Sequence, residues 1–274
     1  MRAFITAACL ALAGCTFGGG GIVPFEPAPP ASVADEDLDV PYVPTPRRVV
    51  EAMLELGEVG PQDYLIDLGS GDGRIAIMAA QRGARALGVD IDPDRVTEAT
   101  LAAQVAGVET RARFRRQDLF DTPLREASVV TMYLLPQINM RLRPRLLTEL
   151  RPGTRILSHN FTLGDWRPDA EREMDASHIY FWIVPAAAEG DWIVEMPDGT
   201  RPRLVLDQRF QDVTGSLDGH ALRNVSLSGR RLRFTVDLPA GARTYQAIVE
   251  DDSIVADPAA ATGSPTGWRA RRAS

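Results

Sequence analysis

The sequence has no lysine, few cysteines and no long apolar run, and these absences exclude several classes of protein. All thirty basic residues are arginines, and with 37 acidic residues they give a net charge of −7. A chain of this charge without a basic cluster is not expected to bind nucleic acid. Both cysteines, Cys9 and Cys15, lie in the first fifteen residues, so the remaining chain can form no disulfide. We also expect no metal site.

The N-terminal apolar run is too short to cross a bilayer of ~30 Å as a helix. Residues 3–12 are apolar and follow Arg2, and residues 12–15, Leu-Ala-Gly-Cys, resemble a lipobox, in which cleavage precedes an acylated cysteine. We predict a signal peptide over residues 1–15, a lipid on Cys15 and a cell-envelope location, which would be the outer membrane if the cell is Gram-negative. The alternative is that Cys15 follows an apolar N-terminus by chance and that the protein is cytoplasmic.

Residues 16–40 are rich in glycine, proline and acidic residues. Such a stretch cannot bury enough apolar surface to offset its loss of conformational entropy. We expect it to form a disordered tether, followed by a larger α/β domain over residues 41–197 and a smaller module over residues 198–274.

The most informative stretch is Tyr64-Leu-Ile-Asp-Leu-Gly-Ser-Gly-Asp-Gly73. It predicts a buried strand over 64–68, a glycine-rich turn and a helix over 74–82. Such a turn brings backbone N–H groups and the positive end of a helix close to a polar ligand. A dinucleotide-binding turn has the spacing G-x-G-x-x-G, and here the third glycine comes one residue early, which disfavours NAD.

The pattern Asp67-x-Gly69-x-Gly71-x-Gly73 is instead similar to the first motif of class I S-adenosylmethionine (SAM) methyltransferases. Two further segments, residues 42–46 (Tyr-Val-Pro-Thr-Pro) and 88–93 (Gly-Val-Asp-Ile-Asp-Pro), narrow the resemblance. It is to the seven-β-strand lysine methyltransferases that act on the adenine nucleotide translocase and ATP synthase subunit c, and their bacterial relatives. The resemblance covers roughly residues 40–160 and implies a doubly wound, Rossmann-like seven-stranded sheet, SAM as cofactor and a protein lysine as substrate, including lysines of membrane proteins.

Asp90 follows a predicted strand over 84–89 and lies about twenty residues beyond the glycine turn, where an acid can accept both ribose hydroxyls. The alternative is a solvent-exposed acid that ends a strand. Asp92 is expected to cap the helix that Pro93 begins. The resemblance adds further cofactor contacts, namely Tyr42, Thr45, Asp67, Gly69, Ser70, Gly71, Gly73, Ile91, Asp118 and Leu119.

The catalytic candidates follow the next two predicted strands. Tyr133 comes at the end of a strand that begins at 127, so it should line the methyl-transfer pocket. His159 follows a strand over 154–158 and could act as a general base or orient an amine. A hydrogen-bonded structural histidine is the alternative. Phe161 and Trp166 could complete an aromatic tunnel, although Trp166 could equally pack in the core.

The C-terminal part has a different pattern. Strands over 177–185 and 191–196 are predicted to complete the sheet at an antiparallel edge. Beyond them, short alternating runs are separated by Asp198-Gly199, Asp218-Gly219 and Ser228-Gly229, which are typical hairpin turns. We expect a small antiparallel barrel or sandwich, which could recognise the substrate or brace the larger domain.

Export conflicts with a SAM-dependent reaction, because SAM is made inside the cell. Three interpretations remain. The first is a membrane-tethered methyltransferase. The second is a non-catalytic envelope lipoprotein that uses the same fold to bind a nucleoside-like ligand or a protein partner. The third, an NAD-dependent enzyme, is disfavoured by the glycine spacing.

Overall fold

The computed structural model describes residues 43–174, 176–239 and 241–273. The predictions that concern Tyr42, the lipid on Cys15, the signal peptide and the tether lie outside these residues. The described chain forms an α/β domain followed by a β-barrel.

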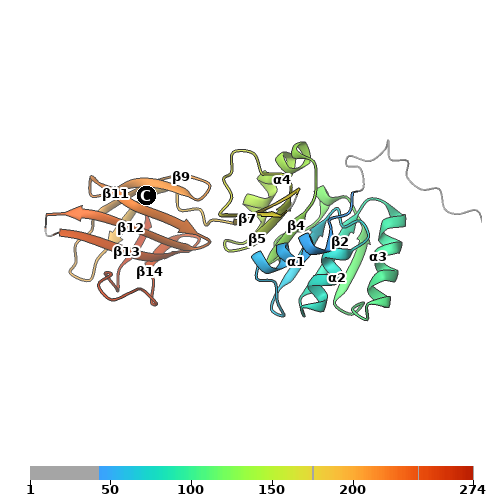
Figure 1. Cartoon of the computed structure of the whole chain (residues 1–274). Helices are drawn as coiled ribbons and strands as arrows, with labels where there is room; N and C mark the ends of the chain where they lie inside the picture. Colours follow the sequence, from blue (N-terminus) through green and yellow to red (C-terminus); the bar gives the residue numbers. More distant parts are fainter. Residues whose placement is uncertain (1–42, 175, 240, 274) are drawn as a thin grey trace, which may run out of the picture. The chain divides into compact units, whose positions relative to one another are not determined.

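The α/β domain is built on one seven-stranded sheet (Figure 1). Its elements are α1 (Arg47–Leu56), β1 (Tyr64–Leu68), α2 (Arg74–Gln81), β2 (Arg85–Asp90), α3 (Pro93–Val105), β3 (Ala112–Arg116), a 3₁₀ turn η2 (Leu119–Asp121), β4 (Val129–Met132), α4 (Pro136–Glu149), β5 (Arg155–His159), β6 (Ala170–Met174) and β7 (Ser177–Ile183). The strand order is β3-β2-β1-β4-β5-β7-β6. Strands β1 to β5 are parallel, and β7 runs antiparallel to β5 and β6. This arrangement confirms the predicted Rossmann-like, doubly wound fold.

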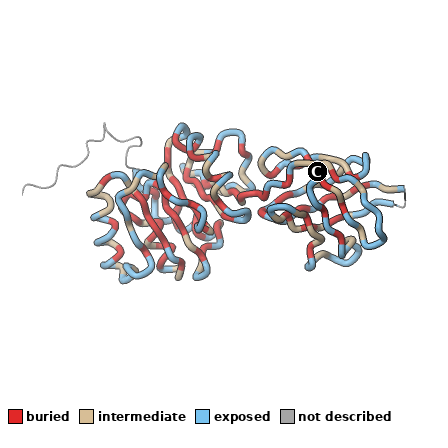
Figure 2. Tube along the Cα trace, turned by 180° about the vertical axis from the view of Figure 1, so that it is seen from behind, coloured by how far each residue is buried: buried red, intermediate tan, exposed pale blue. Residues whose placement is uncertain are grey.

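Alternate side chains of the central strands point into two apolar layers. Leu65 and Leu157 pack with residues of α1 and α2, whereas Ile66 and Ile156 pack with residues of α4. All four are at most 1% exposed, and burial of each such side chain contributes roughly 1.5–3 kcal/mol. Figure 2 shows the buried residues concentrated along the strands. The sheet is therefore covered by helices on both faces.

The strand order places a crevice beside β1. This strand has β2 on one side and β4 on the other, both parallel to it, so the chain crosses over β1 when it passes from β3 to β4. Ligands of open α/β sheets bind at such a switch point, at the carboxyl ends of the strands. The loops after β1, β2 and β4 are therefore the expected location of a site.

The barrel contains β8 (Gly190–Glu195), β9 (Arg203–Arg209), β10 (Asp212–Leu217), β11 (His220–Ser228), β12 (Arg231–Leu238), β13 (Gly241–Val249), β14 (Ser253–Ala256) and β15 (Arg269–Arg272). All neighbours are antiparallel, and the closed order is β10-β11-β12-β13-β14-β15-β8-β9. Between β10 and β11, Asp218 and Gly219 have φ angles of 51° and 80°, as a type I′ hairpin requires. The predicted β module is thus a closed barrel.

Side chains fill the barrel interior. Trp192, Phe234, Tyr245 and Trp268 are all at most 3% exposed. The rings of Phe234 and Tyr245 stack with their centroids 5.0 Å apart. An eight-stranded barrel is just wide enough for side chains to occupy its centre, so this module has its own packed core.

One strand prediction was wrong, and one strand of the sheet was not predicted. Residues 191–196 do not extend the sheet, because β8 pairs with β9 and β15 in the barrel, where Trp192 and Val194 enter the apolar core. The barrel therefore begins before residue 198. The outermost strand of the sheet is instead β6, whose sequence Ala-Glu-Arg-Glu-Met shows no apolar alternation because its residues are only half-buried or exposed at the sheet edge.

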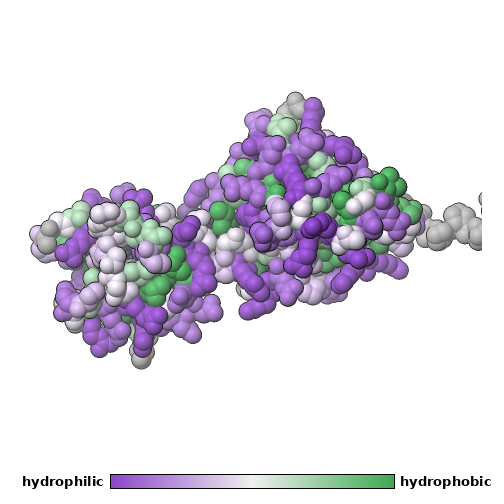
Figure 3. Space-filling view, turned by 90° about the horizontal axis from the view of Figure 1, so that it is seen from below, coloured by the Kyte–Doolittle hydropathy of each residue, from purple (hydrophilic) through white to green (hydrophobic). Residues whose placement is uncertain are grey.

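The described surface is mainly polar. The face in Figure 3 shows hydrophilic residues with small separate groups of apolar ones. The large apolar residues recorded as exposed are Val43, Ile91, Leu101, Val105 and Met140. Within the described ranges, no helix has the length and apolar character needed to cross a membrane.

Candidate functional site

A cavity of about 350 Å³ lies at the carboxyl ends of β1, β2 and β4. This volume is within the range of roughly 300–1,000 Å³ that is usual for small-molecule sites. Most predicted site residues line it, namely Thr45, Asp67, Gly69, Ser70, Gly71, Asp90, Ile91, Asp118, Leu119 and Tyr133. Gly73 and His159 do not line it.

The glycine turn has the backbone conformation that its composition predicts. Gly69, Gly71 and Gly73 have φ angles of 74°, 51° and 78°, which side chains with a Cβ rarely adopt. A Cβ on Gly69 would also lie 2.9 Å from Leu134 Cδ2. Glycine therefore gives the turn its shape and keeps the cavity open.

The N–H groups of this turn are used inside the protein, contrary to the expectation that they face a ligand. Gly69 and Ser70 donate to the carbonyl oxygen of Val89, over 3.0 and 2.9 Å. Gly71 donates to Asp90 Oδ2 over 2.8 Å. These hydrogen bonds join the turn to the end of β2, so side chains supply much of the polarity of the cavity.

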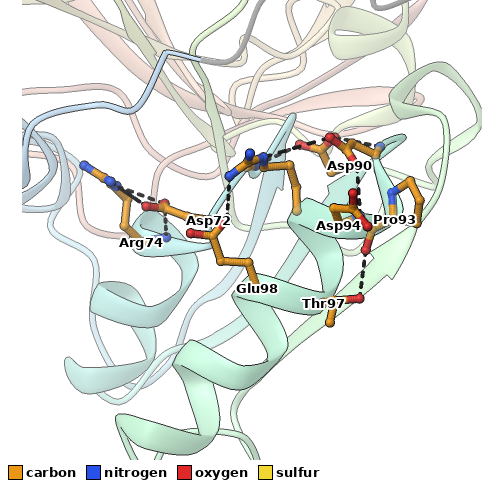
Figure 4. A network of polar contacts seen from close by, with 10 residues as sticks. Asp72, Arg74, Asp90, Pro93, Asp94, Thr97 and Glu98 are labelled. Carbon is orange, nitrogen blue, oxygen red and sulfur yellow. Dashed lines mark hydrogen bonds and ion pairs between the residues drawn. The ribbon is translucent and has the colours of Figure 1, made fainter. Parts of the chain in front are cut away.

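Asp90 is held by two backbone donors. Its Oδ2 accepts from Gly71, and its Oδ1 accepts the N–H of Asp92 over 3.0 Å. Asp92 in turn caps α3 by accepting from Asp94 over 2.8 Å, as predicted. Figure 4 shows Asp90 at the end of β2 and Asp94 at the start of α3, with Asp72 at the glycine turn in the same view. The Asp90 carboxylate is thus oriented before any ligand binds.

Two buried polar atoms in the cavity wall have no hydrogen-bond partner in the described structure. They are Asp67 Oδ2 and Ser70 Oγ. The other oxygen of Asp67, Oδ1, accepts the hydroxyl of Thr131 over 2.7 Å. Burial raises the pKa of Asp67 from 3.8 to about 7, and the neighbouring Asp90 adds to the increase. Because buried polar atoms are normally paired, these two atoms indicate a polar or cationic ligand.

Three of the residues predicted to contact the cofactor, Ile91, Asp118 and Leu119, line the cavity and are half-buried or exposed. Ile91 is 49% exposed and Leu119 is half-buried. Asp118 is exposed, and its Oδ1 accepts the N–H of Phe120 over 2.7 Å at the start of η2. Their position agrees with the predicted contacts, which stay predictions.

An aromatic wall completes the cavity. Tyr133 and Phe161 both line it, with ring centroids 6.0 Å apart and nearly parallel planes. Trp166 does not line the cavity. It is fully buried in the core layer on the α4 side, and its carbonyl oxygen accepts the indole N–H of Trp182. Of the two interpretations of Trp166, the structure supports packing.

His159 is the last residue of β5 and is only 2% exposed. Its Nδ1 lies 3.1 Å from the hydroxyl of Thr45, and its ring centroid lies 4.0 Å from that of Tyr133. Burial lowers the pKa of His159 from 6.5 to about 4. The imidazole is therefore neutral and weakly basic near neutral pH, which favours the structural interpretation over a general base.

Arg74 and Asp72 were not predicted as site residues, although both line the cavity. Arg74 Nε contacts both carboxylate oxygens of Asp72, and Arg74 Nη1 donates to the carbonyl of Thr45 over 2.9 Å. An arginine that begins a helix is usually a solvated surface residue, so the sequence carried no signal for this role. Within the described ranges, no cluster of three His, Cys, Asp or Glu side chains could hold a metal ion.

Comparison with known proteins gives a consistent result. Residues 67–170 match the family model described as ANTKMT methyltransferase domain. A protein-lysine N-methyltransferase of Saccharolobus islandicus is 46% identical over 151 residues, which cover 53% of this chain and 94% of the relative. The adenine nucleotide translocase lysine N-methyltransferase of Mus musculus is 40% identical over 48% of this chain. The chain spans only 58% of the length of that mouse protein.

Solved structures extend the comparison to the cofactor. An RNA methyltransferase from Salinibacter ruber, crystallised with S-adenosyl-L-homocysteine, is 49% identical with a TM-score of 0.52. The match covers 53% of this chain and 95% of that protein. The similarity therefore covers nearly all of the Saccharolobus and Salinibacter proteins but only about half of this chain.

Proposed function

The chain belongs to the family of protein-lysine N-methyltransferases, and from this premise we propose that it methylates the side-chain amine of a lysine in another protein. It is a SAM-dependent methyltransferase. The observation that carries the proposal is the 46% identity to the protein-lysine N-methyltransferase of Saccharolobus islandicus. The match covers 94% of that relative. The geometry of the cavity supports it.

The cavity fits SAM. SAM carries an ammonium and a sulfonium charge against one carboxylate, so it is a net cation. Asp67 presents an unpaired buried oxygen and Ser70 an unpaired hydroxyl, while Asp90 presents an oriented carboxylate at the end of β2. Charge-assisted hydrogen bonds from a cationic ligand would satisfy the buried atoms.

SAM supplies a methyl group on a sulfonium, whose departure leaves a neutral thioether. The protein therefore needs to bring a neutral amine to within ~3–3.5 Å of that carbon and exclude water. An apolar aromatic wall, here Tyr133 and Phe161, favours the neutral form of a lysine amine because desolvation disfavours its charged form. The amine releases its proton to solvent, and His159, with its low pKa, is not required to take it up.

RNA is a second candidate substrate because the Salinibacter structure is described as an RNA methyltransferase. The cavity lining argues against it. Asp67, Asp72, Asp90, Asp92 and Asp118 outnumber the two lining cations, which are both arginines. Phosphate groups would be repelled there.

Transfer of a labelled methyl group tests the proposal. The purified protein, [methyl-³H]SAM and a lysate of the source cells should yield label in protein that hydrolyses to methyl-lysine. Asp90→Ala should lower SAM affinity about 10- to 100-fold, because hydrogen bonds to a charged group contribute about 1.5–3 kcal/mol. Asp121→Ala is the matched control, because Asp121 is exposed and lies outside the cavity lining.

Three outcomes would contradict the proposal. Label found only in RNA would show that RNA, and not a protein lysine, is the substrate. SAM binding without transfer to any fraction would favour a non-catalytic lipoprotein that binds a nucleoside-like ligand. An equal loss of SAM affinity in Asp90→Ala and Asp121→Ala would show that Asp90 does not contribute specifically to SAM binding.

We also propose that the protein is a lipoprotein anchored through Cys15, with a membrane protein as substrate. The support is the sequence of residues 1–40 and the position of Val43, the first described residue, in the cavity lining. As the predicted tether, a glycine- and proline-rich segment of the length of residues 16–40 would span about 25–30 Å. The cavity would then lie within a few nanometres of the membrane surface.

Membrane fractionation tests the anchor. The wild-type protein should remain with membranes after a high-salt wash, and Cys15→Ser should move it to the soluble fraction. Cys9→Ser is the matched control because Cys9 would be removed with the signal peptide. Mass spectrometry that finds intact Met1 on a soluble wild-type chain would contradict the proposal and favour a cytoplasmic enzyme.

A further inference from the structure

Residues 43–46, here called the strap, precede α1 and border the cavity. Val43, Pro44 and Thr45 line it. Val43 is 55% exposed and both prolines are exposed, yet Thr45 is only 4% exposed. One polar residue of an otherwise exposed segment is therefore held inside the protein.

Two contacts hold Thr45. Its carbonyl oxygen accepts from Arg74 Nη1 over 2.9 Å, and its hydroxyl lies 3.1 Å from His159 Nδ1. Arg74 is fixed to Asp72 at the glycine turn, whereas His159 ends β5. The strap is thus attached to two separate elements of the α/β domain.

Among the described residues, Thr45 is the hydrogen-bond partner of the His159 ring. Its other nitrogen, Nε2, is buried without a hydrogen-bond partner among the described residues, and an unpaired buried polar atom is costly. The low pKa that burial imposes on His159 keeps the ring neutral, so Nδ1 can form one hydrogen bond without burying a charge. The same ring packs on Tyr133 in the cavity wall.

We propose that His159 is a positioning residue that fixes the Thr45 hydroxyl, and with it the strap, against the SAM cavity. The inference rests on SAM binding at this cavity and is independent of which molecule accepts the methyl group. It replaces the general-base interpretation of His159 with a role in cofactor affinity.

A double-mutant cycle tests the proposal. SAM affinity is measured by calorimetry without a protein substrate for wild type, Thr45→Val, His159→Asn and the double variant. Each single variant should raise the Kd about 3- to 10-fold, the range expected for one lost neutral hydrogen bond. The double variant should be no weaker than the worse single variant, because both changes remove the same contact. Thr45→Ser, which keeps the hydroxyl, should bind SAM as wild type does.

Thr154→Val is the matched control. Thr154 is as buried as Thr45, at 4% exposed, and its hydroxyl donates to the Ala127 carbonyl over 3.1 Å, before the start of β5. This variant should lose a similar amount of thermal stability and keep its SAM affinity. If His159→Asn does not fold, the comparison of Thr45→Val, Thr45→Ser and Thr154→Val still decides the result.

Steady-state kinetics separate positioning from catalysis. The variants should raise the KM for SAM with kcat within about twofold at saturation, as expected when uniform binding is lost. Effects of Thr45→Val and His159→Asn on Kd that simply add would overturn the coupling. A fall in kcat for His159→Asn with an unchanged Kd would restore the general base. Failure of the wild type to bind SAM would instead overturn the cofactor assignment.

Discussion

Asp67 shows most clearly how a single residue links stability to function. Its carboxyl is buried at 2% exposed, with one oxygen paired to Thr131 and the other unpaired. Burial raises its pKa from 3.8 to about 7. Between those values the folded protein holds a proton that the unfolded chain has lost. The free energy of unfolding therefore falls as the pH rises from about 4 to about 7. Above pH 7 the protein carries the full free-energy cost of burying the ionised Asp67 carboxylate.

Asp67→Asn should stabilise the protein without ligand at pH 8. The cost removed is at most about 4 kcal/mol, since three pKa units correspond to ~1.4 kcal/mol each. An asparagine carbonyl can keep the hydrogen bond from Thr131. Thermal unfolding should show a higher Tm for the variant at pH 8 and no difference near pH 4. A pH-independent difference, or an equal effect of Asp121→Asn, would contradict this expectation.

The same carboxyl should make SAM binding dependent on pH. A bound cation favours ionised Asp67, so binding below pH 7 should release a proton and affinity should increase from pH 6 to pH 8. Calorimetry in two buffers of different ionisation enthalpy measures the released proton. In Asp67→Asn the affinity should be lower and its dependence on pH should largely disappear. Proton release that persists in the variant would place the titrating group elsewhere.

At this scale the sequence predicted the strand-end acid Asp90 and the turn residues, because a motif specifies both residue type and place. It did not predict Arg74, whose contact with the Thr45 carbonyl joins residues 29 positions apart. The contact between Thr45 and His159 spans 114 positions. Such pairs depend on three-dimensional packing, which no local pattern encodes.

At the scale of elements, the glycine turn depends on the space behind it. Gly73 starts α2 with a φ of 78°, and a Cβ there would lie 2.5 Å from the Phe114 ring and 2.7 Å from Ala99 Cβ. Gly107 after α3 has a similar φ of 67° and open space around it. The two positions share backbone strain and differ in crowding.

Gly73→Ala should therefore cost more stability than Gly107→Ala. The left-handed backbone alone costs about 1–2 kcal/mol, and overpacking adds about 1–3 kcal/mol. Urea unfolding should show a small loss for Gly107→Ala and a clearly larger one for Gly73→Ala. Equal losses would mean that Phe114 moves aside without cost.

The elements that the sequence predicted are those with a clear pattern. The Asp92 cap of α3 agrees with prediction because a capping residue is a local signal. Strand β8 was predicted as a strand but assigned to the wrong sheet, because alternation shows that one face is buried and does not show which core it enters.

At the scale of the whole molecule, the cavity is built from one domain. All its lining residues lie between 43 and 161, before the barrel begins at residue 190. The family model also ends before the barrel, at residue 170. Cofactor binding should therefore be independent of the barrel.

A chain that ends at residue 189 should bind SAM with a Kd within about threefold of wild type, because the loss of groups that do not contact a ligand changes its affinity little. Calorimetry measures the Kd, and circular dichroism confirms that the shortened chain is folded. A folded fragment that has lost SAM binding would show that the barrel supports the cavity. Retained binding with lost methyl transfer would assign the barrel to substrate recognition.

Every ion pair of the described residues has an arginine as its basic partner, for example Arg155 with Asp63 and Arg203 with Asp191. The chain contains no lysine at all, so neither the enzyme nor a second copy of it can accept a methyl group on a lysine amine. Any methyl-lysine formed in a purified mixture must belong to the other protein. A carbodiimide, which joins carboxylates to lysine amines, would likewise form no lysine cross-links within the enzyme, so the adducts it captures would report the substrate directly.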